Sequence, residues 1–161
     1  MNTDAIEGIA THTLKFTKGT KVNPTLFERH PEKPVIFSNG DNIWPEIAML
    51  GNFRKQGYEG YWVDTFPQTV FWKSQREHAS YEELPPGTQT VLEGVRKKNN
   101  GFSGCWDLVA WNKAGDMKYI ELLGPGEVIN QNQIDFMNNL VKSGTRRDAF
   151  LIIGWDYSQT F

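Results

Sequence analysis

The stretch CWDLVAWNKAGDMKYIELL, residues 105–123, decides the fold of this protein. Two runs rich in β-favouring apolar residues, at 105–111 and 117–123, flank the polar segment NKAGD. This pattern predicts a β-hairpin. Its simplest closure is a three-residue loop with Gly115 in the left-handed conformation, which Gly adopts without steric cost.

That closure sets the register of the two strands. Counted outward from the loop, Val109 faces Tyr119 and Asp107 faces Glu121. Directly opposed residues point to the same face of a sheet, with Cβ atoms ~5 Å apart. The sequence therefore predicts two carboxylates side by side within an otherwise apolar strand pair.

Two adjacent acids in an apolar setting need a compensating partner. Like charges repel and a buried carboxylate is costly, so a cation, a shared proton or solvent is expected at Asp107 and Glu121. A divalent metal would serve, since Mg²⁺ commonly takes one or two carboxylates and keeps several waters. The alternative is structural: both acids lie at strand ends and accept hydrogen bonds from loop amides.

The rest of the chain alternates helical and strand patterns. Apolar spacing, caps and breakers favour an α/β fold with a mixed sheet covered on both faces. The expected helices are 41–56, capped by Asp41 or Asn42, then 88–100 with Gly101 as C-cap, and 130–143. The other expected strands are 11–17 at a sheet edge, 60–66, 68–74 and 150–155.

Composition sets further bounds. A chain of 161 residues suits a single domain, 1–161, which we divide into an N-terminal extension, 1–40, and a core, 41–155. The net charge of −2 provides no global basic field for nucleic acid, so any such binding must be local. The single cysteine, Cys105, and the lack of an apolar leader or membrane-length run favour a cytoplasmic protein without a membrane partner.

The segments GFSGCWDLVAW (101–111) and KYIELLGPGEVINQNQIDFMNNLVKSG (118–144) resemble the VRR-NUC branch of the PD-(D/E)XK nuclease superfamily. The resemblance implies a restriction-endonuclease-like core that hydrolyses DNA phosphodiester bonds with Mg²⁺ or Mn²⁺. It places the metal-binding acids on Asp107 and Glu121 and a helix glutamine on Gln133. A further metal ligand is expected at Glu46.

Two positions depart from the family pattern. Trp106 replaces a proline before the first acid, which changes the turn and not the chemistry. Leu123 replaces the motif lysine and can neither activate water nor stabilise charge on phosphate. Lys118 has the wrong strand parity to substitute, and Lys142 lies about 13 Å along its helix from Gln133. The remaining candidate cations are Arg54, Lys55 and Lys73.

Three functions follow from these residues. The first is a Mg²⁺-dependent nuclease acting on DNA. The second is a catalytically inactive pseudo-nuclease that binds nucleic acid or a protein, and the third is a small-molecule-binding α/β domain. Basic runs at 96–98 and 142–148 are typical of solvated helix ends, and would contact phosphates if they lay on the rim of the acid site. Whether the chain forms a homodimer stays open.

Overall fold

The computed structural model describes residues 8–21, 30–64, 69–71 and 78–158. The strands form a mixed sheet in the order β3-β2-β1-β9-β8-β7-β4-β5-β6. Neighbours β1 and β9, and β9 and β8, run parallel, whereas the remaining pairs are antiparallel. The expected α/β fold with a mixed sheet is confirmed.

The strands are β1 (Ala10–Lys18), β2 (Ile36–Ser38), β3 (Asp41–Ile43), β4 (Glu59–Asp64), β5 (Thr69–Phe71), β6 (His78–Ser80), β7 (Leu108–Trp111), β8 (Met117–Leu123) and β9 (Phe150–Tyr157). The helices are α1 (Pro45–Lys55), α2 (Pro86–Asn99) and α3 (Gln131–Lys142), with short 3-10 turns η3 (Tyr81–Glu83) and η4 (Arg147–Ala149).

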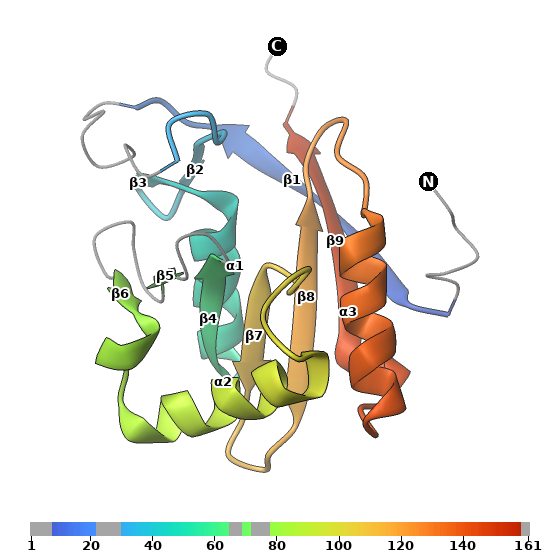
Figure 1. Cartoon of the computed structure of the whole chain (residues 1–161). Helices are drawn as coiled ribbons and strands as arrows, with labels where there is room; N and C mark the ends of the chain where they lie inside the picture. The colour runs from blue at the N-terminus through green and yellow to red at the C-terminus, as the bar shows by residue number, and fades with distance from the viewer. Residues whose placement is uncertain (1–7, 22–29, 65–68, 72–77, 159–161) are drawn as a thin grey trace.

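Helices cover both faces of the sheet. Figure 1 shows α2 and α3 in front of the central strands and α1 behind them. Each side has its own apolar core: Val109 and Tyr119 pack with α2 and α3, whereas Leu108 and Ile120 pack with α1. Adjacent residues of one strand thus pack into the cores on opposite faces of the sheet. Because both faces are buried, β7 and β8 are apolar almost throughout.

The central hairpin has the register expected from its loop. Gly115 has φ +86°, and the backbone N–H groups of Asn112 and Gly115 close the turn at 3.2 and 3.0 Å from the carbonyls of Asp116 and Asn112. Val109 pairs with Tyr119 in the ladder. The first strand is shorter than expected, because β7 begins only after Asp107.

Several expected boundaries are wrong. Asp41 and Asn42 do not cap α1 but form β3 with β2, and the helix begins at Pro45 after the buried Trp44. The C-cap of α2 is Asn100, which adopts the left-handed conformation at φ +57° that Asn tolerates. For the expected pair 60–66 and 68–74, β4 and β5 are antiparallel neighbours, and Pro67 between them lies outside the described residues.

The N-terminal part of the chain contributes to the same sheet. The strand expected at an edge is β1, which lies between β9 and β2. Strands β2 and β3 lie where the sequence indicated mostly loop over 18–42 and a helix from 41. Within the described part of the chain, no helix combines the length and apolar character needed to cross a membrane.

Candidate functional site

Asp107 and Glu121 meet where β7 begins. The backbone N–H of Asp107 donates to Glu121 Oε1 at 2.9 Å, and the N–H of Leu122 donates to Asp107 Oδ2 at 2.9 Å. The carbonyl of Asp107 accepts from Val63 N at 3.0 Å, which holds it against β4. Part of the structural alternative is therefore realised, because each acid accepts a backbone hydrogen bond from the opposite strand.

Gln133 closes the site from the start of α3. Its side chain is the third residue of a capping box with Asn130: Oε1 accepts from Asn130 N at 2.9 Å. Its Nε2 donates to Glu121 Oε2. The same amide thus caps the helix and binds the acid.

A close backbone approach sets the position of that helix start. Gly104 has φ +73°, and a Cβ there would overlap the carbonyl group of Asn132, 2.5 Å from its carbon. Beside it, the indole Nε1 of Trp106 donates to the Gln133 carbonyl at 2.9 Å. The loop before β7 therefore locks the first turn of α3 over the two acids, and only glycine fits at 104.

The electrostatics of the acid pair are unfavourable for two full charges. Glu121 is 3% exposed. Burial, followed by the charge of Asp107, holds the pKa of Glu121 far above its usual range. Burial and the Glu46 charge also raise the pKa of Asp107, against the opposing effects of Lys33 and the Leu122 N–H. Together the two carboxyls retain a proton near neutral pH unless a further cation compensates them.

A cation does reach the site, from a segment that the sequence did not single out. Lys33 Nζ lies 2.7 Å from Glu46 Oε1, and the Glu46 side chain is 5% exposed. The ammonium also lies over the ring of Trp62, 5.2 Å from its centroid. Glu46 and Trp62 belong to the α1 side of the sheet, so Lys33 lies on the face opposite to Gln133 and acts on Asp107 through its charge.

Lys33 keeps its charge in this position. Burial favours loss of its proton, but the neighbouring acids, Glu46 foremost, together outweigh that effect and raise the pKa of Lys33 above its usual value. Asp107 and Glu127 act in the same direction. The ammonium is therefore shared electrostatically between acids from α1, the start of β7 and the turn after β8.

The donor set fits a divalent ion held by two carboxylates. Asp107 and Glu121 supply oxygen ligands at one point, and water would complete the shell of an ion such as Mg²⁺. Glu46 adds a buried Oε2 without a hydrogen-bond partner among the described residues. However, no three His, Cys, Asp or Glu side chains converge to form a metal site in the described ranges. Glu46 acts on Asp107 through its charge and is neutralised by Lys33.

Of the other residues considered from the sequence for this cation, those in the described part of the chain lie away from the acid pair. Leu123 packs into the core beside α3. Arg54 and Lys55 lie in the last turn of α1, about 12 Å along the helix from Glu46. Lys73 lies outside the described residues. Lys33 was missed because it follows a Gly- and Pro-rich segment and no periodicity links it to Glu46.

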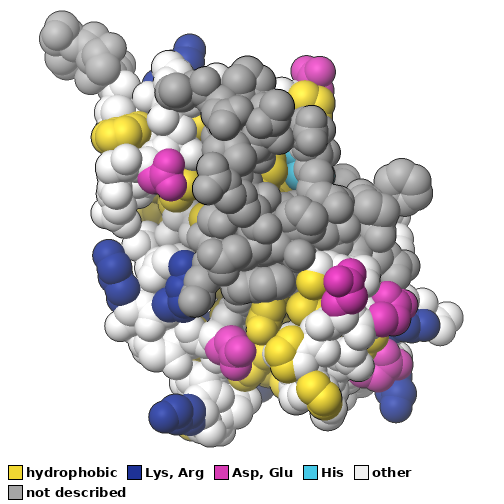
Figure 2. All heavy atoms as spheres, turned by 90° about the vertical axis from the view of Figure 1, so that its left-hand side faces the viewer, with side chains coloured by type: hydrophobic (Ala, Val, Ile, Leu, Met, Phe, Trp, Pro, Cys, Tyr) yellow, Lys and Arg dark blue, Asp and Glu magenta, His cyan; other side chains and the backbone are white. Residues whose placement is uncertain are grey.

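The described surface agrees with the low net charge. On the side shown in Figure 2, Lys and Arg side chains alternate with Asp and Glu side chains and do not gather into one patch among the described residues. Comparison with protein-family models and with curated protein sequences finds no match to this chain. Its function must therefore be inferred from the geometry of the site.

Proposed function

We propose that this protein is a Mg²⁺-dependent hydrolase of DNA phosphodiester bonds, a nuclease of the PD-(D/E)XK type with a relocated lysine. The observation that carries the proposal is the contact between Asp107 and Glu121 where β7 begins, together with the Lys33 ammonium, whose charge acts on Asp107. Two acids and one lysine are the set that this chemistry requires, although the lysine comes from another part of the chain.

Each residue has a distinct role in the proposal. Asp107 and Glu121 would hold the ion, which would supply Lewis-acid activation of the phosphodiester. Gln133 keeps the Glu121 carboxylate oriented. Lys33 stabilises negative charge that develops on the phosphate, as Leu123 cannot. Glu46 holds Lys33 in place through the 2.7 Å ion pair.

A second candidate is the pseudo-nuclease that binds nucleic acid without cleaving it. Two observations favour it: both oxygens of Glu121 already accept hydrogen bonds, from Asp107 N and Gln133, and Lys33 is committed to Glu46. In this case the Asp107–Glu121 pair is a structural remnant. Binding would then persist without any dependence on a divalent ion.

A cleavage assay distinguishes the two functions. Supercoiled, linear, single-stranded and branched DNA are incubated with the protein and Mg²⁺ or Mn²⁺. The proposal expects metal-dependent cleavage, reduced about 100-fold or more in Glu121→Ala because the ion is lost. Cleavage that survives Glu121→Ala would contradict it. No cleavage with either metal, together with retained binding, would establish the pseudo-nuclease.

The role of Lys33 needs a variant that stays folded. The double variant Lys33→Met with Glu46→Gln removes the cation without leaving a buried anion, and we expect it to lose cleavage while keeping DNA affinity. Lys55→Met is the matched control, since Lys55 is exposed at the other end of α1. If both variants cleave equally, Lys33 has no catalytic role. Adding Leu123→Lys to the double variant is expected to restore part of the activity.

A further inference from the structure

A pocket lies at the opposite end of β8 from the acid site. Its volume is about 600 Å³, and it lies at the hairpin, where β8 extends beyond β9. The parallel strand β9 begins opposite Tyr119, so Met117 and Lys118 pair with β7 on one side only. Met117 is about 13 Å from Glu121 along the strand, so the two sites are separate.

The two basic runs of the sequence meet in this pocket. Lys98 comes from the end of α2, and Thr145 and Arg146 follow α3. The Lys98 ammonium donates to Thr145 Oγ1 at 3.5 Å. A hydrogen bond from Asn139 to Asn99 at 2.9 Å ties the two helix ends together. The basic residues thus lie beside each other and away from Asp107 and Glu121.

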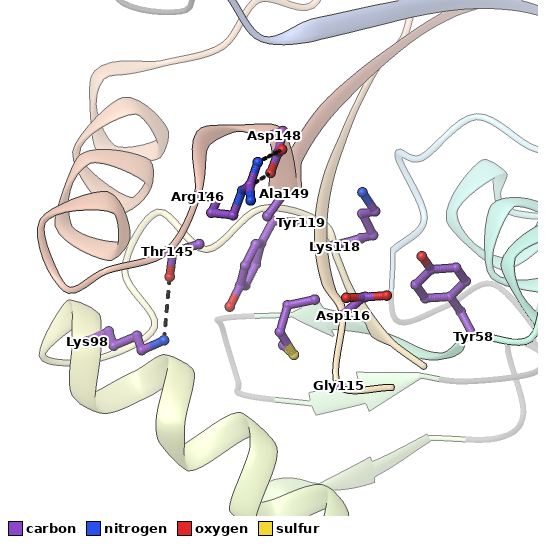
Figure 3. Close-up of a pocket in the computed structure, with 11 residues that line it drawn as sticks. Tyr58, Lys98, Gly115, Asp116, Lys118, Tyr119, Thr145, Arg146, Asp148 and Ala149 are labelled. Carbon is purple, nitrogen blue, oxygen red and sulfur yellow. Dashed lines mark hydrogen bonds and ion pairs between the residues drawn. The ribbon is translucent and has the colours of Figure 1, made fainter. Parts of the chain in front are cut away.

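Tyr119 supplies a polar group aimed into the same space. The residue is 1% exposed and its ring stacks on Phe150, with centroids 4.9 Å apart. Figure 3 shows its hydroxyl end pointing into the pocket on the side of Lys98. Among the described residues the hydroxyl has no hydrogen-bond partner, and it is not one of the buried unsatisfied atoms, so it is available to a ligand in the pocket. Burial raises the pKa of Tyr119 to about 12, so the hydroxyl remains a donor at neutral pH.

The acids that line the pocket are already engaged. The Asp148 carboxylate accepts two hydrogen bonds from Arg146, at 3.2 and 2.8 Å, and Asp116 accepts from Asn112 Nδ2 at 3.1 Å. Lys98, in contrast, has no carboxylate partner among the described residues. Most of the polar groups that remain available to a ligand in the pocket are therefore hydrogen-bond donors.

We propose that this pocket binds a phosphate group, with the Lys98 ammonium and the Tyr119 hydroxyl as its principal donors. The Thr145 hydroxyl, which accepts from Lys98, retains its own proton for a ligand oxygen. Arg146 uses one edge of its guanidinium for Asp148 and keeps further N–H groups. Several donors from different directions suit a tetrahedral oxyanion better than a planar carboxylate.

Calorimetric titration with pyrophosphate tests the site on the intact chain. EDTA is present and ionic strength is constant, so that the acid site cannot contribute through a metal. We expect saturable binding, with Tyr119→Phe and Lys98→Met each weakening it about 10-fold through the loss of a donor to a charged ligand. Lys97→Met is the matched control, because the neighbouring Lys97 does not line this pocket, and it should bind as the wild type does.

The Tyr119→Phe variant is unusually informative. It removes only a hydroxyl that has no partner in the described part of the chain, so its free energy of unfolding should equal or exceed that of the wild type without ligand. The proposal is overturned if the wild type shows no saturable binding, or if Tyr119→Phe and Lys98→Met bind as tightly as Lys97→Met. Acetate at the same ionic strength should not compete; if it displaces pyrophosphate, the preference for phosphate is wrong.

The source of the phosphate is decided by competition. A short single-stranded oligonucleotide with a 5′-phosphate is added to the pyrophosphate titration, and the same oligonucleotide with a 5′-hydroxyl serves as its control. Displacement by the phosphorylated strand alone assigns the site to a nucleic-acid end. Displacement by neither strand assigns it to a small phosphate-bearing molecule. Either outcome is consistent with Lys98 and Tyr119 as the phosphate donors. The nuclease assay tests the acid site separately, so failure of one proposal can be told from failure of the other.

Discussion

The Lys33 ammonium lies 2.7 Å from Glu46 Oε1 and acts electrostatically on Asp107. This relationship brings a positive charge to the acid pair from a segment far away in the sequence. Leu123 occupies the position at which the family resemblance expects that charge. Under the proposed function, Lys33 would therefore take the place of that lysine from a different element of the fold.

The ion pair predicts a strong coupling between Lys33 and Glu46. Lys33→Met leaves a buried carboxylate without its cation and should reduce the free energy of unfolding by about 3 kcal/mol. Adding Glu46→Gln should recover most of that loss. Urea denaturation of both single variants and the double variant measures the coupling. The exposed pair Lys15–Asp156, at 3.8 Å, is the control, and Lys15→Met should cost under about 0.5 kcal/mol. Equal losses at both positions would contradict the buried pair.

The acid pair predicts that Asp107→Asn stabilises the metal-free protein. The folded-state pKa values of Asp107 and Glu121 are raised, so between the ordinary carboxyl pKa and these raised values the folded state binds more protons than the unfolded state. Stability therefore falls as pH rises through that window. The amide oxygen of the substituted side chain could still accept from Leu122 N. We expect a gain of about 2 kcal/mol at pH 8, disappearing towards pH 4.

Urea denaturation at the two pH values measures this gain, with the exposed Asp135→Asn as control. Destabilisation by Asp107→Asn at pH 8 would mean that the acids are fully compensated without a metal. Mg²⁺ should raise the stability of the wild type more than that of Asp107→Asn, because a ligand stabilises the state that binds it.

Gly104 predicts a local steric effect that reaches Glu121. Gly104→Ala would place a Cβ 2.5 Å from the carbonyl carbon of Asn132, so the first turn of α3 must shift and carry Gln133 with it. We expect a loss of about 3 kcal/mol or more in the free energy of unfolding. Gly115 is the control: its φ is also positive, but a Cβ there meets nothing within 4 Å, so Gly115→Ala should cost only about 1 kcal/mol. Similar losses would show that conformation, and not the contact with α3, governs Gly104.

Cys105 predicts a protected thiol. It is 8% exposed, and burial raises the pKa of its thiol far above the usual value, with a further contribution from Glu121. At pH 8 a disulfide reagent should therefore react with it only as fast as the protein opens. Because Cys105 is the single cysteine, the modified fraction reports directly on that opening. Rapid labelling of the folded chain would show that the loop before β7 opens independently of the core.

Local patterns were sufficient for the central hairpin and for its acids. The strand period of two and the geometry of a loop containing Gly115 require Val109 to face Tyr119, and the structure has this register. Likewise, the helix expected over 130–143 is α3, and its capping box joins Asn130 to Gln133, three residues away. Such features depend on residues that are close in the chain, so the local sequence is enough to predict them.

Only the tertiary structure decided which cation serves the acids and where the basic runs lie. Lys33 reaches Asp107 because α1 packs on one face of the sheet and brings Glu46 beneath it. Lys98 contacts Thr145, beside Arg146, because the ends of α2 and α3 pack together at the far end of β8. These contacts join residues distant in sequence, and their geometry comes from how helices bury apolar faces against the sheet, for which no local periodicity provides a register.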